Sequence, residues 1–163
     1  MQFNIGETIK LNRVHDTPQQ VQDGQNRYSY TIVSYHRNNS NPNKSKWTIL
    51  EDEEIACFLK SMREAWIFDK VAWGLHLKET EILQLGISSS PFNEILKCAK
   101  FVCNQDNWHG YPADFMRNIH DKPHSNILNS WLDKKFITKS VPLRADSAPS
   151  RATGLIPITS SRR

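Results

Sequence analysis

The order of hydrophobic and polar residues predicts short strands in the first half of the chain. Residues 27–36 are rich in aromatic and β-branched side chains, which favours a strand. Residues 37–46 are too polar to be buried and predict a loop, and residues 47–50 predict a second, shorter strand. Three further apolar runs predict strands, namely residues 66–68, 71–78 and 81–87. The pair Glu79-Thr80 can join the last two runs as a hairpin.

Three other segments follow the helical period instead. From Glu51 onward, four acidic residues precede apolar residues at helical spacing, as the helix dipole favours. Ser90 and Pro91 predict the N-cap and first residue of a second helix. Its apolar face would be formed by Phe92, Ile95, Leu96, Ala99, Val102 and Cys103. A third helix begins at Pro123 or His124, with Ile127, Leu128, Trp131 and Leu132 facing inward.

These elements predict an α+β fold, because strands and helices do not alternate regularly along the chain. We expect a small antiparallel sheet from the N-terminal half to pack against two or three helices. A chain of 163 residues suits one domain with a real core, which we assign to residues 1–139.

The composition changes abruptly near residue 140. Residues 140–163 contain no Lys, Asn or aromatic residue, but they contain four Arg and are rich in Ala and Pro. Lys and Asn have A-rich codons, whereas Arg, Ala and Pro have mostly G/C-rich ones. We therefore interpret residues 140–163 as a disordered basic tail derived by recombination, as in bacterial mobile elements. The alternative is an ordinary low-complexity tail.

The charge distribution weakens a nucleic-acid interpretation. The net charge of +4 divides into +1 for residues 1–139 and +3 for residues 140–163, so the basic character belongs to the tail. Three cysteines without a C-x-x-C motif indicate reduced thiols. No apolar run approaches the ~20 residues needed to span a bilayer, and no signal peptide is visible. We expect a soluble, cytoplasmic protein with no membrane association.

Chemically active side chains are concentrated between residues 106 and 124. This stretch contains three of the six histidines and three of the nine aspartates of the chain. Gly110, Pro112 and Pro123 predict a shaped loop rather than a continuous helix or strand. Ordered loops that carry titratable and aromatic groups commonly form sites.

One hypothesis for this loop is acid–base catalysis. Two histidines and a cation can cleave a phosphodiester without metal, because one imidazole accepts a hydroxyl proton, the other protonates the leaving oxygen, and the cation stabilises the phosphorane. The candidate catalytic residues are His109, His120, Lys122 and Asp114, with Arg117 and Asp121 as alternatives for the cation and for the carboxylate that orients an imidazole. This mechanism requires the His109 and His120 rings to lie within about 10 Å of each other.

A second hypothesis is an interaction site, with Trp108, Tyr111 and Arg117 as the binding residues for a protein or nucleic-acid partner. Such a site requires at least one of these three side chains to be exposed beside an apolar patch. The competing structural interpretation is that Trp108 and Tyr111 fill the core while Gly110 and Pro112 shape a turn.

Other kinds of site find little support. His120 and His124 have the i, i+4 spacing of a helical metal pair, but Pro123 between them keeps His120 off the helix, so we predict no metal site. The chain has no P-loop, G-x-G-x-x-G or G-x-S-x-G motif, and we predict no cofactor. Residues 125–139 could begin a helix-turn-helix, but the composition changes where the recognition helix should follow.

The residues therefore favour an interaction or accessory module without an assignable catalytic activity. A small metal-independent nuclease, similar in kind to a toxin RNase, is the first alternative. A small-molecule-binding or modifying enzyme is the second. The oligomeric state is not indicated by the sequence.

Overall fold

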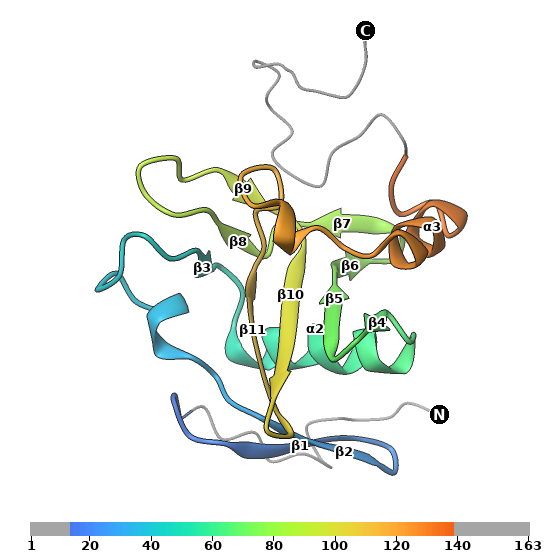
Figure 1. Cartoon of the computed structure of the whole chain (residues 1–163), viewed down its shortest axis with the longest axis horizontal. Helices are drawn as coiled ribbons and strands as arrows, with labels where there is room; N and C mark the ends of the chain where they lie inside the picture. Colours follow the sequence, from blue (N-terminus) through green and yellow to red (C-terminus); the bar gives the residue numbers. More distant parts are fainter. Residues whose placement is uncertain (1–13, 139–163) are drawn as a thin grey trace, which may run out of the picture.

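A computed structural model describes residues 14–138, and most of the strands in this part of the chain are joined in β-hairpins (Figure 1). The main sheet has six strands in the order β1-β2-β11-β10-β5-β4. Their bounds are β1 Gln19–Asp23, β2 Asn26–Tyr30, β4 Ile67–Phe68, β5 Val71–Gly74, β10 Ala99–Asn104 and β11 Asn107–Pro112. All neighbouring strands are antiparallel except β11 and β2, which are parallel.

Two smaller sheets complete the β structure. One contains β3 (Lys46–Trp47), β8 (Gly86–Ile87) and β9 (Ile95–Leu96), in the order β3-β8-β9. The other is the hairpin of β6 (His76–Lys78) and β7 (Glu81–Leu83), in which Lys78 pairs with Glu81. The predicted Glu79-Thr80 turn is thus confirmed.

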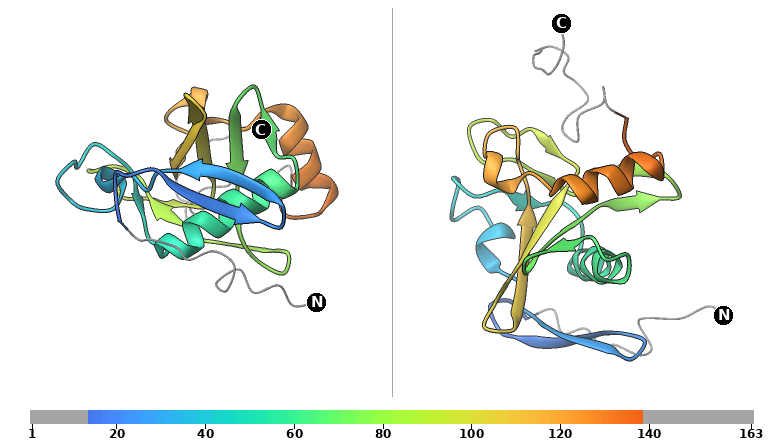
Figure 2. Two further views of the ribbon diagram at one scale, coloured as in Figure 1. Left: turned by 90° about the horizontal axis from the view of Figure 1, so that it is seen from below. Right: turned by 45° about the vertical axis from the view of Figure 1, so that its right-hand side comes forward.

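Two α-helices are present in the described part of the chain. Helix α2 (Glu51–Arg63) begins where the four acidic residues predicted it, and the Leu50 amide donates to the Glu53 carboxylate at 2.9 Å. Helix α3 (Ser125–Asp133) lies beside the β6–β7 hairpin, at the opposite end of the molecule from the β1–β2 hairpin (Figures 1 and 2). Two 3-10 turns, η1 (Ser34–His36) and η2 (Ile119–Asp121), lie in the connections.

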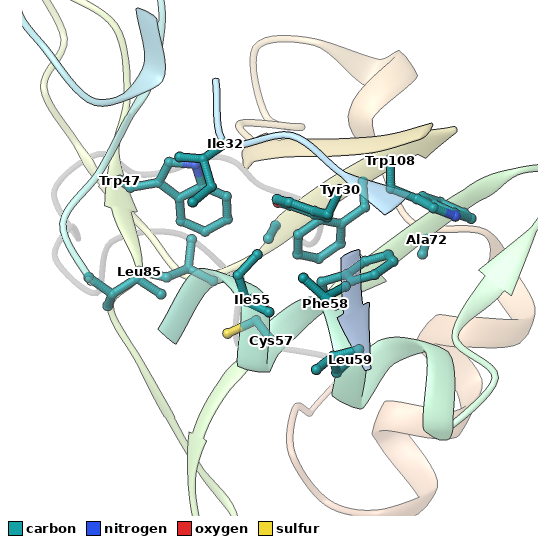
Figure 3. Packing of buried hydrophobic residues seen from close by; sticks show 14 residues of the cluster. Tyr30, Ile32, Trp47, Ile55, Cys57, Phe58, Leu59, Ala72, Leu85 and Trp108 are labelled. Atoms are coloured by element: carbon teal, nitrogen blue, oxygen red, sulfur yellow. The ribbon is translucent and has the colours of Figure 1, made fainter. Parts of the chain in front are cut away.

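The larger hydrophobic core lies between α2 and one face of the main sheet. Phe58 of α2 is fully buried and meets the rings of Tyr30, Phe101 and Trp108 at centroid distances of 5.0 to 5.4 Å (Figure 3). Rings at these distances add to the free energy gained by burying their surface. Phe58 therefore contacts β2, β10 and β11 at once, and Ile55, Cys57 and Leu59 of α2 lie in the same cluster.

A second core lies under α3. Trp131 of α3 packs edge-on against Trp66 at 5.6 Å, and the cluster includes Trp73, Leu75 and Cys98. The predicted inward face of α3 is confirmed for Ile127 and Trp131, which are buried. Helix α2 therefore packs against the strands through the first cluster, and helix α3 packs against them through the second.

A buried ionic network connects the first core to the loop before β3. Glu54 of α2 is fully buried, accepts a hydrogen bond from the Tyr30 hydroxyl at 2.6 Å and pairs with Arg37 Nη2 at 2.6 Å. Burial raises the pKa of Glu54, while Arg37 and the Tyr30 hydroxyl act against that rise. Removing Arg37 would therefore leave a carboxylate without its partner inside the core.

Two sequence predictions about this fold are wrong. The helix predicted from Ser90 to Cys103 does not form, because residues 99–104 are β10, paired with β5 on one side and β11 on the other. The sheet is also not confined to the N-terminal half and not wholly antiparallel, since its central strands are β10 and β11. The general α+β character, with a multi-stranded sheet and two α-helices, is confirmed.

The tail predicted from residue 140 lies outside the described residues, as does the start of the predicted domain. Between residues 14 and 138, none of the helices combines the length and the apolar character that crossing a membrane requires.

Candidate functional site

The stretch from residue 106 to 124 is not one loop, as the sequence predicted, but a central strand followed by a loop. Residues 107–112 form β11, where inward and outward side chains alternate. Trp108 is only 7% exposed and lies in the larger core, whereas His109 and Tyr111 lie half-buried on the other face. Trp108 thus has almost no surface to offer a partner.

Gly110 explains why this stretch can be a strand despite its turn-like composition. A Cβ atom built on Gly110 would lie 2.3 Å from Cδ1 of Phe101, its partner on β10. Such a contact is far inside van der Waals distance, so the ring of Phe101 occupies the space that any other residue would need. The glycine serves close packing between strands rather than a turn.

Asp121 fixes the loop after β11 to the outer face of the sheet. Its carboxylate Oδ1 accepts from the Tyr111 hydroxyl at 2.8 Å and from Lys100 Nζ at 3.2 Å. Its carbonyl oxygen accepts from the Trp73 indole at 3.0 Å. Burial, and then the Asp121 carboxylate, raise the pKa of Tyr111 well above its usual range. Tyr111 is therefore a neutral hydrogen-bond donor within the structure rather than a free surface ring.

The ring of His36 packs on the ring of Tyr111. The two rings are parallel within 14° with centroids 5.2 Å apart, and the His36 Nδ1 atom lies 2.7 Å from the carbonyl oxygen of Ser45. Because a carbonyl can only accept, Nδ1 carries the proton. Burial lowers the pKa of His36 to about 4, so the ring is neutral at physiological pH.

Arg117 lies on a different part of the surface, where the loop after β11 meets the loop between β8 and β9. Its guanidinium carbon is 3.4 Å from the centre of the Phe92 ring, and Nη2 donates to Glu94 at 2.9 Å. Its Nε lies 3.5 Å from Asp114. Burial raises the pKa of Asp114, and the nearby Arg117 opposes that rise. Asp114 thus acts here as a partner of Arg117.

Exposed apolar side chains occur on the same two loops as this guanidinium or at their edges. In residues 14–138, nine large hydrophobic side chains are exposed, and four of them lie on these two loops or at their edges: Phe92, Ile95, Met116 and Ile119. Together with Arg117 we call these four residues the Arg117 surface. Its exposed Arg117 packs on the exposed Phe92 ring, which is the kind of contact that the interaction hypothesis requires.

A groove lies between the β4–β5 hairpin and the start of α3. Its volume is about 240 Å³, and it is lined by Phe68, Asp69, Val71, Trp73, Lys100, His120, Lys122 and His124. The rings of Phe68 and His124 stack at 3.9 Å. We call this cavity the Phe68–His124 groove. A second cavity of about 190 Å³ shares these two stacked rings.

The four candidate catalytic residues are distributed over separate places. His120 and Lys122 line the Phe68–His124 groove, whereas His109 is on β11 opposite Val102 and Asp114 is beside Arg117. His109 and Asp114 do not line the groove, so it does not contain the full acid–base set. Burial lowers the pKa of His109, which favours its neutral form.

The residues that sequence reasoning missed lie on other elements. Phe92 and Glu94 were assigned to a helix, and Phe68 and Lys100 were assigned no role. One signal was available in the sequence, because Gln105-Asp106 is a polar pair between two runs with apolar residues, where a two-residue hairpin turn can lie. In the structure both residues have positive φ, as such a turn requires. Reading the pair as a turn would have placed β10 beside β11.

Between residues 14 and 138, no group of three or more His, Cys, Asp or Glu side chains is arranged to bind a metal ion. No family model, curated protein or solved structure matches this chain. The surfaces described above are therefore the basis for assigning a function.

Proposed function

We propose that this protein is an interaction module that binds a partner protein through the Arg117 surface. The observation that carries the proposal is the Arg117 guanidinium held 3.4 Å from the centre of the exposed Phe92 ring, on a segment that also exposes Met116 and Ile119. Arg, aromatic residues and Met are the types enriched in the centres of protein interfaces.

The surface is held in place before any partner binds. Arg117 is connected to Glu94 and Asp114, which lie on the two loops that meet there. A side chain already fixed by its neighbours loses less conformational entropy when it enters an interface. The guanidinium can thus stay packed on the exposed Phe92 ring when a partner binds, with little further loss of conformational entropy.

A protein partner fits the charges better than a nucleic acid does. Residues 14–138 carry 14 Lys and Arg against 15 Asp and Glu, a formal charge of −1. The charge of Arg117 is also offset by two carboxylates on the same surface. Phosphate backbones are bound by uncompensated cations, so an apolar protein face is the better match.

The test compares two exposed phenylalanines of equal accessibility. Phe92 is 48% exposed on the Arg117 surface and Phe68 is 49% exposed in the Phe68–His124 groove. Immobilised wild type, Phe92→Ser and Phe68→Ser would be incubated with lysate of the producing cells, with and without nuclease treatment, and bound proteins quantified by mass spectrometry. Thermal melting checks that both variants fold.

We expect a set of proteins that binds wild type and Phe68→Ser but is reduced at least tenfold with Phe92→Ser, because exposed aromatic side chains often contribute much of the binding free energy of an interface. Arg117→Ala should cause a similar loss, since it removes the guanidinium that packs on that ring. Equal capture by all variants would reject the Arg117 surface. Capture that disappears after nuclease treatment would mean that nucleic acid carries the interaction.

A further inference from the structure

We propose that the Phe68–His124 groove binds a mononucleotide, that is, a ligand with a planar base, a sugar hydroxyl and a phosphate. The groove is formed by β4, β5, β10 and the chain from His120 to His124, and it shares no residue with the Arg117 surface. The inference therefore does not depend on the interaction module proposed above.

Hydrogen-bond donors for a phosphate come from the chain between η2 and α3. The Nδ1 atom of His124 accepts a hydrogen bond from the Asn126 amide at 3.2 Å and caps α3. A nitrogen that accepts carries no proton, so the neutral ring must carry its proton on Nε2 and can donate it. The helix cap thus sets which tautomer of His124 a ligand meets.

Lys122 supplies the positive charge of the cavity, and Lys100, whose charge is offset by Asp121, can supply a further hydrogen-bond donor. Lys122 is exposed at its rim. Lys100 is more deeply placed, and its ammonium group is held by the carbonyl of His120 at 3.0 Å and by Asp121 at 3.2 Å. An ammonium group has three donors, and a phosphate accepts strongly from such charged groups. The first turn of α3 adds favourable backbone dipoles at this end of the groove.

The remaining lining residues suit the other parts of a nucleotide. Phe68 is half-exposed and stacked on His124, while Val71 and Trp73 form an apolar wall. Stacking of a base on an aromatic side chain contributes about 1–3 kcal/mol. Asp69 is an acceptor, which a sugar hydroxyl needs and a phosphate does not. This mixture of groups fits a nucleotide better than it fits a simple inorganic anion.

The hairpin between β4 and β5 holds Phe68 and Asp69 in position. Asp69 and Lys70 form its two-residue turn, with φ of 56° and 65°, and Phe68 pairs with Val71 across it. Both residues adopt the left-handed conformation that a tight hairpin requires. This pairing therefore fixes the positions of Phe68 and Val71 in the lining of the groove.

The experiment is a ¹⁵N-resolved NMR titration of the full-length chain with uridine 5′-monophosphate, adenosine 5′-monophosphate, uridine and inorganic phosphate. We expect saturable shifts at residues 68–73, 100 and 120–124 with the monophosphates, and binding at least fivefold weaker for uridine and for phosphate. Lys122→Gln should weaken monophosphate binding about tenfold, the amount expected for loss of one charge-assisted hydrogen bond. Lys134→Gln, an exposed lysine just after α3, serves as the matched control and should bind as wild type does.

Three results would overturn the proposal. The first is the absence of saturable shifts in the groove at 10-fold to 100-fold excess of either monophosphate. The second is equal affinity for phosphate and for the monophosphates, which would leave an anion site without a base. The third is unchanged binding by Lys122→Gln. Phe92→Ser should leave the titration unchanged, so the groove and the Arg117 surface are tested separately.

Discussion

The buried His36 should make the stability of this protein depend on pH between about 4 and 6.5. The ring is 6% exposed, packs on Tyr111 and donates from Nδ1 to Ser45. Burial lowers the pKa of His36 from 6.5 to about 4. The folded protein therefore keeps the ring neutral at pH values where the unfolded chain has already taken up a proton.

The sign follows from which state binds more protons. Between pH 6.5 and about 4 the unfolded chain carries the extra proton, so the free energy of unfolding falls as the pH is lowered. The full effect corresponds to about 3 kcal/mol, at about 1.4 kcal/mol for each tenfold difference in proton affinity. About 2 kcal/mol of it should be lost between pH 7 and pH 5.

Urea unfolding followed by tryptophan fluorescence, from pH 7 to pH 5, measures this loss in wild type and in His36→Gln. The glutamine amide can donate to the Ser45 carbonyl but does not titrate, so the variant should lose about 2 kcal/mol less than wild type over this range. His109→Gln should show a smaller change of the same sign, because burial also lowers the pKa of His109. The exposed His120 provides the control variant His120→Gln. Parallel curves for wild type and His36→Gln would refute the assignment.

Three further predictions concern packing, the buried ion pair and catalysis. Gly110→Ala should lower the free energy of unfolding by about 1–3 kcal/mol, because its Cβ would collide with Phe101; an unchanged urea midpoint would contradict this close approach. Arg37→Ala should destabilise by about 3–5 kcal/mol because it leaves the Glu54 carboxylate unpaired, and adding Glu54→Gln should recover part of the loss in the same assay. For the nuclease alternative, degradation of labelled RNA and DNA by wild type should be abolished in His109→Ala; equal rates, or no degradation by wild type, would remove that function.

Local patterns in the sequence were sufficient for several elements. Helix α2 carries its own signals, four acidic residues followed by apolar positions at helical spacing, and it begins at Glu51 as predicted. The Glu79-Thr80 turn and helix α3 were likewise predicted from neighbouring residues. The sequence also indicated the stretch that contains Arg117, His120 and Lys122, although not the surfaces that these side chains join.

Tertiary structure decided the elements whose local patterns are ambiguous. Residues 92–103 place apolar side chains at helical spacing, but in the structure buried Ala99 and Phe101 alternate with partly exposed Lys100 and Val102, as in a strand. The strand forms because β5 and β11 supply hydrogen bonds on both sides and because Gly110 leaves room for the Phe101 ring. Neither condition is visible within the segment itself.

The candidate sites depend on tertiary structure for the same reason. Arg117 meets Phe92 across 25 positions of sequence, and His124 meets Phe68 across 56. The sequence by itself determined which residue types are available and which local elements they favour. Only the pairing of distant strands, driven by burial of the shared core, decided that Trp108 is interior, that Arg117 lies over an exposed ring, and that the Lys122 rim faces Phe68.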